Sequence, residues 1–386
     1  MPNKKKVLIL AFSRLQYDAR ITRQIKFLMK DYEVEVFCFS KTDIPGVHFY
    51  EVGQTSLTLF RKAFAALFLI TRQYKRVYWI LHNYKEYLSI LKKKNYDLII
   101  ANDVETLHFG FNIAKTGNGK VLFDAHEYAP RHFEDKLWFR LFFQGFNKYF
   151  CNIYIPRVSA MTTVCDGLAE EYEKHFGLKP EIITNAPGYQ ENLPKNTNPD
   201  KIRLIHMGTA NFSRKLENMI DVVNLLDDRY TLDLMLLTPA YASPQTKDYV
   251  ENLKQEIAEN PKVKIIDPVP SSQVVNKIKS YDMGIFLLEP VNFNYTFALP
   301  NKLFEFIQAR LAIAIGPSPE MAKIVHKYGC GVVSVDFTPA SLAKAIQQLS
   351  VTDIDKMKAN CQLAATEESA EKNEEKLRAI CNNLLQ

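Results

Sequence analysis

Short apolar runs alternate with segments of helical periodicity from one end of this chain to the other. The runs are continuous and rich in β-branched residues, as in strands buried on both faces of a parallel sheet. The helical segments between them predict right-handed β-α-β crossovers, and therefore an α/β fold. Thirteen strands are predicted, at Val7–Phe12, Val34–Phe39, Val47–Val52, Asp97–Ala101, Lys120–Asp124, Ala160–Val164, Glu181–Thr184, Ile202–Met207, Thr231–Leu237, Val263–Asp267, Asp282–Leu287, Leu311–Ile315 and Gly331–Val335.

One polar stretch, QENLPKNTNPD at Gln190–Asp200, interrupts this alternation and indicates a linker. It divides the chain into a first domain at 1–190, a linker at 191–200 and a second domain at 201–352. The charge-rich tail at 353–386 predicts a terminal helix. We expect two Rossmann-like, doubly wound domains that face each other, with ligands at the carboxyl ends of their strands.

The composition favours a soluble, cytoplasmic protein. Hydrophobic residues make up 47% of the 386 positions, enough for two domain cores of ordinary size. The six cysteines form no CxxC pair, which is typical of reduced thiols in the cytosol. The apolar run near the N-terminus stops at Arg14, too soon for a signal peptide, and no uncharged stretch approaches the length of a membrane-spanning helix.

The net charge of +6 is concentrated in the first half, since residues 1–190 carry 27 Lys and Arg against 19 Asp and Glu. Such a half is expected to meet an anionic partner: membrane headgroups, nucleic acid or a phosphorylated substrate. Two stretches, Leu59–Ile80 and Lys136–Phe150, mix basic with aromatic residues and could bury an apolar face in the inner leaflet of the membrane. The alternative is that they cover the first sheet, with the basic groups in solvent.

Several common sites are absent from the sequence. The loop SRLQYD after the first strand lacks the glycines of a dinucleotide-binding fingerprint, and there is no GxxxxGK[ST] or HExxH motif. The sequence GNGK at Gly117–Lys120 is interpreted as a turn before a strand. Asp353 and Asp355 begin the tail helix and are interpreted as capping residues. No metal site is therefore predicted.

The most informative segment is Asn292–Gly316, NFNYTFALPNKLFEFIQARLAIAIG. A Pro-Asn-Lys turn opens a helix there, with Asn301 or Leu299 as the predicted N-cap. Helix N-termini attract pyrophosphate, and Lys302 adds a full positive charge. Glu305 lies one turn further along, where its carboxylate could bind both hydroxyls of a ribose. On these residues alone, an ordinary helix with a solvated Lys and Glu remains the alternative.

This segment resembles the donor signature of family 4 glycosyltransferases of the GT-B fold, in the subgroup N-Y-x-x-A-x-P-[NS]-K-L-F-E-[YF]. The segment Pro317–Asp336 is also similar to that family. The resemblance implies a retaining enzyme that moves a hexose-type sugar from a nucleoside-diphosphate sugar to an acceptor hydroxyl, in cell-surface polysaccharide or glycolipid assembly. It implies donor contacts from Asn294, Tyr295, Pro300, Asn301, Lys302, Leu303 and Glu305.

In the second domain, the first strand ends in Gly208 and Thr209, and Arg214 follows. The resemblance implies that these residues hold the donor, with Arg214 and Lys302 neutralising its diphosphate. A guanidinium is a sound phosphate ligand. The chain departs from the family at Thr209, where arginine is usual, and at Phe297, where a second glutamate is common. A glycine that usually follows the signature helix is replaced by Arg310.

In the first domain, the resemblance implies an acceptor side built from residues that follow three strands. His126 matches the family histidine at the reaction centre, where a neutral imidazole would hydrogen-bond a donor hydroxyl; a structural histidine is the alternative. Asn185 matches the asparagine that closes the first domain. The other acceptor-side residues are Asp18, Arg20, Asn102, Asp103 and Glu127.

The resemblance extends over the whole chain and implies that the tail helix crosses back onto the first domain. We expect no cofactor and no metal, because protein cations and helix N–H groups would neutralise the leaving diphosphate. The expected partners are a nucleotide-sugar donor, a glycan or lipid-linked acceptor and an anionic membrane, and no nucleic acid. Two alternatives remain: a sugar-nucleotide epimerase on the same scaffold, and an inactive nucleotide-binding or scaffolding subunit, which Thr209 and Phe297 would favour.

Overall fold

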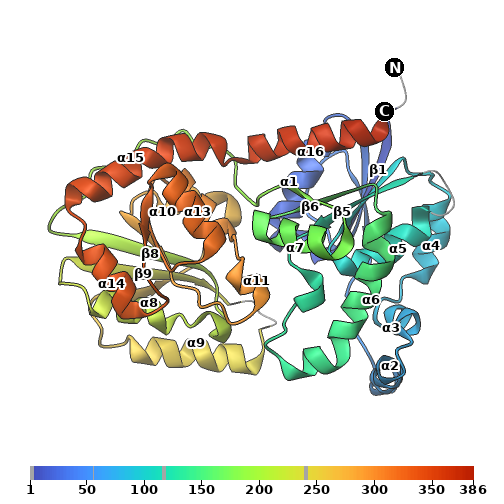
Figure 1. The fold of residues 1–386 in the computed structure, drawn as a ribbon, viewed down its shortest axis with the longest axis horizontal. Helices are drawn as coiled ribbons and strands as arrows, with labels where there is room; N and C mark the ends of the chain where they lie inside the picture. Colours follow the sequence, from blue (N-terminus) through green and yellow to red (C-terminus); the bar gives the residue numbers. More distant parts are fainter. Residues whose placement is uncertain (1–3, 55, 115–118, 239–241) are drawn as a thin grey trace. The chain divides into compact units, whose positions relative to one another are not determined.

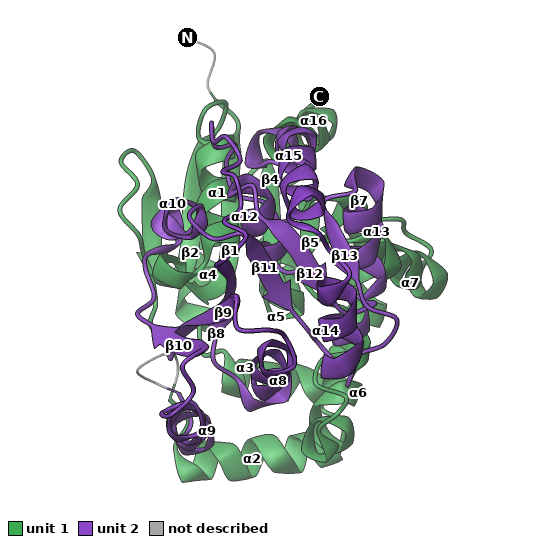
Figure 2. Ribbon diagram, turned by 90° about the vertical axis from the view of Figure 1, so that its left-hand side faces the viewer, with its two compact units in different colours: residues 1–184, 292–294, 373–386 green, residues 185–291, 295–372 purple. Residues whose placement is uncertain are grey.

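The chain folds into two compact units, which are described one at a time. The computed structural model describes residues 4–54, 56–114, 119–238 and 242–386. Unit 1 comprises Met1–Thr184, Asn292–Asn294 and Asn373–Gln386, and unit 2 comprises Asn185–Val291 and Tyr295–Lys372 (Figure 2). Each unit is therefore built from segments that are far apart in the sequence.

Unit 1 contains a seven-stranded parallel sheet in the order β3-β2-β1-β4-β5-β6-β7. Its strands are β1 (Lys6–Arg14), β2 (Glu33–Ser40), β3 (His48–Glu51), β4 (Leu98–Asn102), β5 (Lys120–Ala125), β6 (Ala160–Thr163) and β7 (Glu181–Ile182). The chain adds strands on one side of β1 and then on the other, so β1 and β4 form a topological switch point. Ligands of doubly wound sheets bind at such a point.

Helices cover both faces of this sheet (Figure 1). Val7, Ile9 and Ala11 of β1 pack on one face, in a core that includes Ile21 and Leu377. On the other face Gly110 lets its helix approach Leu10 closely. The helical segments are η1 (Leu15–Tyr17), α1 (Ala19–Leu28), α2 (Leu59–Ile70), α3 (Tyr74–Leu81), α4 (Lys85–Lys92), α5 (Val104–Ala114), η2 (Ala129–Arg131), η3 (Phe139–Phe143), α6 (Gln144–Tyr154), η4 (Ile155–Arg157), α7 (Asp166–Phe176) and α16 (Ala370–Leu385).

Unit 2 repeats the architecture with six parallel strands in the order β10-β9-β8-β11-β12-β13. Its strands are β8 (Ile202–Thr209), β9 (Tyr230–Leu237), β10 (Val263–Ile266), β11 (Met283–Phe286), β12 (Ala312–Ile315) and β13 (Gly331–Val333). Its helical segments are η5 (Phe212–Arg214), α8 (Glu217–Asn224), α9 (Pro244–Glu256), η6 (Ser271–Gln273), α10 (Val274–Ile278), α12 (Asn301–Gln308), α13 (Pro319–Tyr328), α14 (Pro339–Gln347) and α15 (Val351–Glu367), and the short α11 (Phe293–Thr296) connects the two units.

The α/β prediction is confirmed, and each of the thirteen predicted strands is present. The single tail helix predicted at 353–386 is wrong, because α15 ends at Glu367 and α16 starts at Ala370. Glu368 leaves the helical region, with φ −100° and ψ 68°. The capping interpretation is confirmed for Asp353, which forms a capping box with Ser350.

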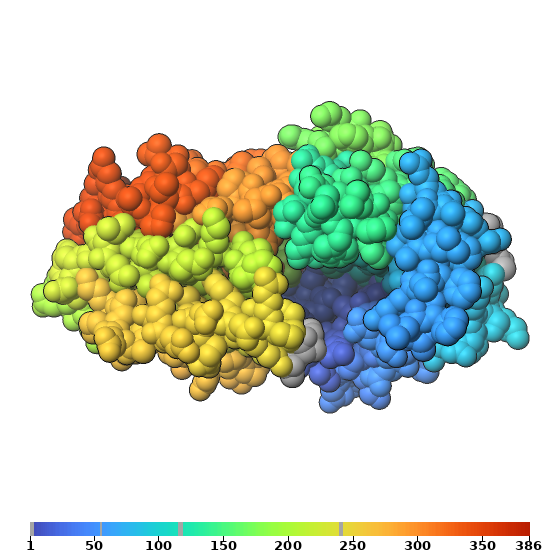
Figure 3. Space-filling model, turned by 90° about the horizontal axis from the view of Figure 1, so that it is seen from below, coloured from blue at the N-terminus to red at the C-terminus, as the bar shows by residue number. Residues whose placement is uncertain are grey.

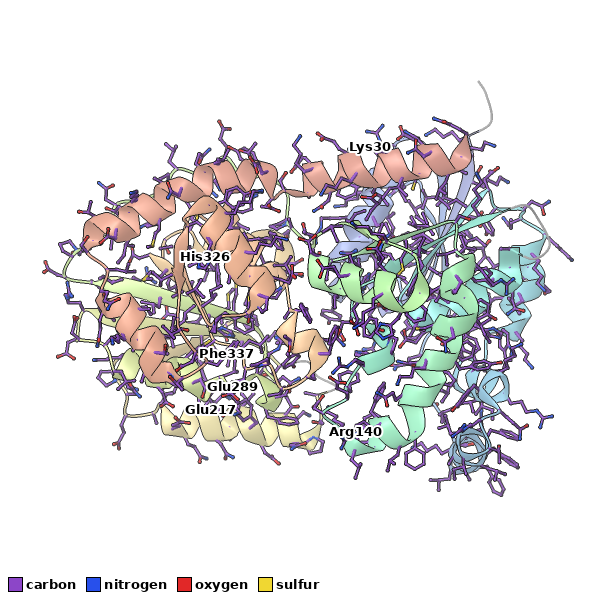
Figure 4. All side chains as sticks on the ribbon, in the orientation of Figure 1. Lys30, Arg140, Glu217, Glu289, His326 and Phe337 are labelled. Atoms are coloured by element: carbon purple, nitrogen blue, oxygen red, sulfur yellow. The ribbon has the colours of Figure 1, made fainter. Side chains whose placement is uncertain are left out.

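The C-terminal residues 373–386 return to unit 1, as the resemblance implied. Leu377 and Cys381 are buried in its core, and Arg378 forms a two-bonded ion pair with Asp31 at 2.6 and 2.9 Å. Lys30 lies beside the same helix and pairs with Glu374 (Figure 4). The apolar contacts fix the position of α16, and the partly exposed ion pairs add less to the stability.

The stretch interpreted as a linker is bonded to unit 2. Thr197 donates two hydrogen bonds to the Asp355 carboxylate, from its N–H at 2.9 Å and from its hydroxyl at 2.7 Å. The turn predicted at GNGK includes Gly117 and Asn118, which lie outside the described residues. None of the helices in the described ranges is both long and apolar enough to cross a membrane.

Arg310 explains why the signature helix α12 can end without glycine. Its backbone is left-handed, with φ 61°, at the position after the helix where glycine is usual. The side chain is 1% exposed, and its guanidinium donates to the carbonyl oxygens of Ile307, Gln308 and Gln190 at 2.8–3.2 Å. These bonds satisfy carbonyls at the end of α12 and offset the backbone strain.

Candidate functional site

Two cations of unit 2 converge on a glycine at the carboxyl end of β8. Gly208 has φ 140°, and a Cβ placed on it would lie 3.3 Å from Lys302 Nζ and 3.4 Å from Arg214 Nη1. Arg214 is held there by a bond from Nη1 to the Thr209 carbonyl at 3.2 Å. A side chain at position 208 would fill the space that both cations reach. This arrangement suits a bound anion.

The N-terminus of α12 borders the same space. Pro300 is the N-cap, which corrects the prediction of Asn301 or Leu299, and no side chain caps the first turn. Proline presets the backbone that opens a helix, because its ring fixes φ. Lys302 and Leu303 are buried, and Phe306 packs on Gly284 of β11, where a Cβ would overlap the ring. The sheet therefore fixes the direction in which the first turn points its N–H groups.

Lys302 is an unusual buried cation. It is 5% exposed, and its Nζ lies 3.7 Å from the centre of the Phe286 ring and 3.3 Å from His206 Nε2. Among the described residues it forms no ion pair. Burial lowers the pKa of Lys302 well below its usual value, and the charge of Arg214 lowers it further. A buried lysine without a carboxylate partner is suited to bind an anionic ligand.

His206 is the functional candidate that the sequence reasoning missed. It lies two residues before Gly208, and therefore on the same face of β8. Its Nδ1 donates to the Ile285 carbonyl at 3.1 Å, which leaves Nε2 to accept from Lys302. Burial and the charge of Lys302 lower the pKa of His206 well below its usual value, so the ring is neutral. The available signal was its period-two spacing from a glycine at a strand end.

The other predicted donor residues of unit 2 lie around Gly208, Lys302 and Arg214. Glu305 is half-buried in the second turn of α12, and its charge raises the pKa of Lys302. The Tyr295 hydroxyl lies 2.9 Å from Ser213 Oγ, next to Arg214. Thr209 is exposed at the end of β8. Pro300 and Asn301 are brought to the same edge by α12, so unit 2 gathers every predicted donor residue except Asn294.

Asn294 belongs to unit 1. Its side-chain oxygen accepts from the Tyr128 N–H at 2.7 Å, and its amide donates to the Tyr128 carbonyl at 3.4 Å. The neighbouring Phe293 stacks under Arg131, whose guanidinium lies 4.5 Å from the ring centre. The side chain of Asn294 thus anchors its segment to unit 1, and its contact with a donor stays a prediction.

Three of the predicted acceptor-side residues form the framework of unit 1. Asp18 caps α1 by accepting from the Ile21 N–H at 3.1 Å. Arg20 is buried and paired with Asp124. Asn102 donates to the Leu10 carbonyl at 3.1 Å. These side chains hold the ends of β1, β4 and β5 together, and contact with an acceptor stays a prediction for them.

His126 lies between two carboxylates at the ends of β4 and β5. Its Nδ1 is 3.0 Å from Asp103 and its Nε2 is 3.5 Å from Asp124. Burial alone would lower the pKa of His126, but the charge of Asp103 and the hydrogen bond that Nδ1 donates to it raise the pKa to about 10, while Nε2 has no hydrogen-bond partner among the described residues. The ring is therefore an imidazolium at neutral pH, and the neutral imidazole predicted from the sequence is corrected. Glu127 pairs with His132 at 2.7 Å.

We expect His126 to remain doubly protonated at pH 8, as measured by ¹⁵N shifts of its ring nitrogens. The raised pKa means that its contribution to stability is complete below its unfolded value of about 6.5 and is lost as pH rises toward 10. Asp103→Asn should lower the titration midpoint, because it removes the nearer charge. A titration midpoint near that of a free histidine, about 6.5, in the unaltered protein would contradict the assignment of His126 as an imidazolium.

Among the described residues, no group of histidine, cysteine, aspartate and glutamate has the geometry of a metal site. The predicted site residues form two clusters of different charge. In unit 2, Lys302 and Arg214 lie beside Gly208. In unit 1, His126 lies between the carboxylates of Asp103 and Asp124. That catalysis needs no metal stays a prediction.

Comparison with known proteins identifies the fold and the first unit. Residues 20–188 match the model of Glycosyltransferase Family 4. No curated protein matches the sequence. Among solved structures, sucrose-phosphate synthase from Thermosynechococcus elongatus is 12% identical with a TM-score of 0.75, and 99% of each chain is covered.

Two further solved structures are similar over nearly the whole length. HepE from Anabaena, in complex with UDP-glucose, is 14% identical with a TM-score of 0.70, covering 98% of this chain and 99% of that one. A glycosyltransferase from Rickettsia africae is 14% identical with a TM-score of 0.68, covering 100% and 99%. Residues 20–188 therefore carry the sequence pattern of glycosyltransferase family 4, and on the structural likeness the whole length of this chain has the GT-B fold.

Proposed function

We propose that this enzyme transfers a hexose-type sugar from a nucleoside-diphosphate sugar to an acceptor hydroxyl, with retention of configuration. The observation that carries the proposal is the convergence of Lys302 and Arg214 on the space above Gly208. Two cations and a helix N-terminus around one small space match the charge and size of a diphosphate. HepE, which shares the fold, was solved with UDP-glucose, and this supports the same class of donor.

In the proposed reaction the bond between the anomeric carbon and the diphosphate oxygen breaks, and a bond from that carbon to the acceptor oxygen forms. The acceptor proton passes to a donor phosphate oxygen. Lys302 and Arg214 stabilise the negative charge that develops on the leaving diphosphate, which is the largest requirement of such a transition state. Glu305 binds the ribose hydroxyls, and His126, as an imidazolium, donates a hydrogen bond to the sugar.

The acceptor is proposed to be a glycan or a lipid-linked saccharide, in the assembly of a cell-surface polysaccharide or glycolipid. A lipid-linked acceptor requires an enzyme that works at a membrane surface. The setting proposed is therefore the cytoplasm, at the inner face of the membrane.

We expect UDP or GDP, with their sugars, to raise the melting temperature of the full chain in a thermal-shift screen. A ligand present at a hundred times its Kd should add about 2.7 kcal/mol to the free energy of unfolding. NMR of the donor with protein then tests the reaction. Slow release of free sugar in the absence of acceptor supports transfer, conversion of the donor to its epimer identifies an epimerase, and binding without turnover identifies an inactive subunit.

A further inference from the structure

The exposed side of α2 is apolar, the reverse of an ordinary surface helix. Its inward residues Ala65 and Leu69 are buried, while Phe60 and Ile70 are 79% and 67% exposed. Surface helices of soluble proteins turn charged and polar residues outward. The exposed apolar residues of α2 are Leu59, Phe60, Ala63, Phe64, Ala66, Leu67 and Ile70, and the exposed Lys62 lies at the edge of this set. This helix therefore presents a continuous apolar strip, with no polar side chain within it.

A second apolar set lies on the neighbouring segment that contains η3. Trp138 and Leu141 are 52% and 67% exposed, and Leu137 and Phe142 are exposed beside them. α2 contacts η3, so the two sets adjoin. Figure 3 shows the segments 59–76 and 136–150, in blue and blue-green, on one face of unit 1. We call these two segments together the basic-aromatic face. Exposed apolar surface of this extent marks an interaction site.

The rim of the basic-aromatic face is strongly positive. Its two segments contain eight lysines and arginines and no aspartate or glutamate. Arg140, labelled in Figure 4, projects from the η3 segment and is exposed. Among the described residues none of the eight forms an ion pair. They are Arg61, Lys62, Arg72, Lys75, Arg76, Lys136, Arg140 and Lys148.

This combination favours a lipid surface over a protein or a nucleic acid. Protein interfaces are depleted of lysine, and four of the eight cations are lysines. Nucleic-acid sites pair cations with phosphates and offer no place for exposed Leu67 and Ile70. A helix with an apolar strip and a basic rim lies in the plane of a membrane, with its strip in the acyl boundary and its cations among the headgroups.

We infer that the basic-aromatic face of unit 1 binds the surface of an anionic lipid bilayer, with α2 in the interface. Aromatic residues such as Trp138 fit the headgroup level, where a ring can be partly apolar and partly hydrated. This surface is distinct from the cation pair at Gly208, so lipid binding and donor binding can be measured independently.

The test is flotation of the full chain with vesicles of phosphatidylcholine, alone or mixed with phosphatidylglycerol. We expect binding to the mixed vesicles to be stronger by about tenfold or more, and to weaken as salt is added. The double variant Phe60→Gln with Leu67→Gln should lose most of this binding without any change of charge. The matched control is Leu193→Gln, which changes a residue that is 84% exposed outside the face and should bind like the unaltered protein.

Three results would overturn the inference: equal binding to both kinds of vesicle at low salt, unchanged binding of the double variant, or loss of binding in the control as well. Self-association or nucleic-acid binding that the same double variant abolishes, without vesicle binding, would assign the face to another partner and overturn it too. Calorimetry with UDP should be unchanged in each variant. A failure of vesicle binding is therefore distinguishable from a failure of the proposed sugar transfer.

Discussion

Lys302→Met should remove most donor binding while leaving the protein at least as stable as before. The lost contact is a charge-assisted hydrogen bond to phosphate, which is worth about 1.5–3 kcal/mol, or roughly a 10- to 100-fold weaker affinity. Methionine has a similar length and packs well against an aromatic ring, here Phe286. Calorimetry with the nucleotide found in the thermal-shift screen measures the affinity, and urea unfolding measures the stability.

The sign of the stability change follows from the lowered pKa of Lys302. The folded protein binds fewer protons at this position than the unfolded chain does, so the lysine contributes a cost at neutral pH that disappears as pH rises toward its unfolded value. Methionine removes that cost at every pH. If Lys302 had only a structural role, its replacement by methionine would lower the free energy of unfolding.

Lys358→Met is the matched control, because Lys358 is a second buried lysine of unit 2 with the opposite surroundings. Its Nζ lies 3.0 Å from Asp282 and 3.2 Å from the Thr197 hydroxyl. Removing it leaves the Asp282 carboxylate buried without its cation, which should cost about 3–5 kcal/mol. Donor affinity should be unchanged in the folded variant. Unchanged nucleotide affinity in Lys302→Met would contradict the assignment of the site.

The strands could be predicted because a continuous apolar run has few other solutions in a chain of this size. Runs such as Ile202–Met207 are too short for buried helices and are bounded by polar turns. The local sequence is therefore enough to predict that they form strands. The donor edge could be predicted for a similar reason. Lys302 and Glu305 are one turn apart on a helix that a proline opens, and that spacing is local.

The charge state of His126 could not be predicted, because it depends on residues that only the fold brings together. Asp103, whose charge raises the pKa most, reaches the imidazole from the end of the neighbouring strand β4 with a left-handed backbone, φ 61°, whereas Asp124 lies two residues before His126 on β5. The role of Arg310 at the end of α12 could not be predicted for the same reason, because its partner Gln190 lies 120 residues away in the sequence. Local periodicity carries no information on such contacts, whereas burial and long-range pairing determine them.

Arg20→Leu should destabilise unit 1 by about 3–5 kcal/mol, the largest stability loss expected for any residue predicted from the sequence. The guanidinium forms a two-bonded pair with Asp124, from Nε at 2.9 Å and Nη2 at 2.5 Å, and both side chains are almost fully buried. It also donates to the carbonyl of Ile183, the residue that follows β7. Leucine leaves a buried carboxylate whose cation has gone. Urea unfolding at pH 7 measures the loss.

The dependence on pH separates this ion pair from a simple packing defect. Burial would raise the pKa of Asp124, but Arg20 and then His126 hold it well below its usual range. A depressed carboxyl pKa contributes stability that is complete above its unfolded value of about 3.9 and is lost as pH falls through the folded value. The gap between Arg20→Leu and the unaltered protein should therefore be widest near neutral pH and shrink in acid.

The double variant Arg20→Leu with Asp124→Leu provides the remaining control. Replacing both members of a buried pair by apolar residues is often close to neutral, so much of the stability should return. Nucleotide affinity should stay unchanged in both variants while they remain folded, because Lys302 and Arg214 lie in unit 2. A loss that is independent of pH, or a double variant as unstable as Arg20→Leu, would show that Arg20 acts through its packed volume and not through its charge.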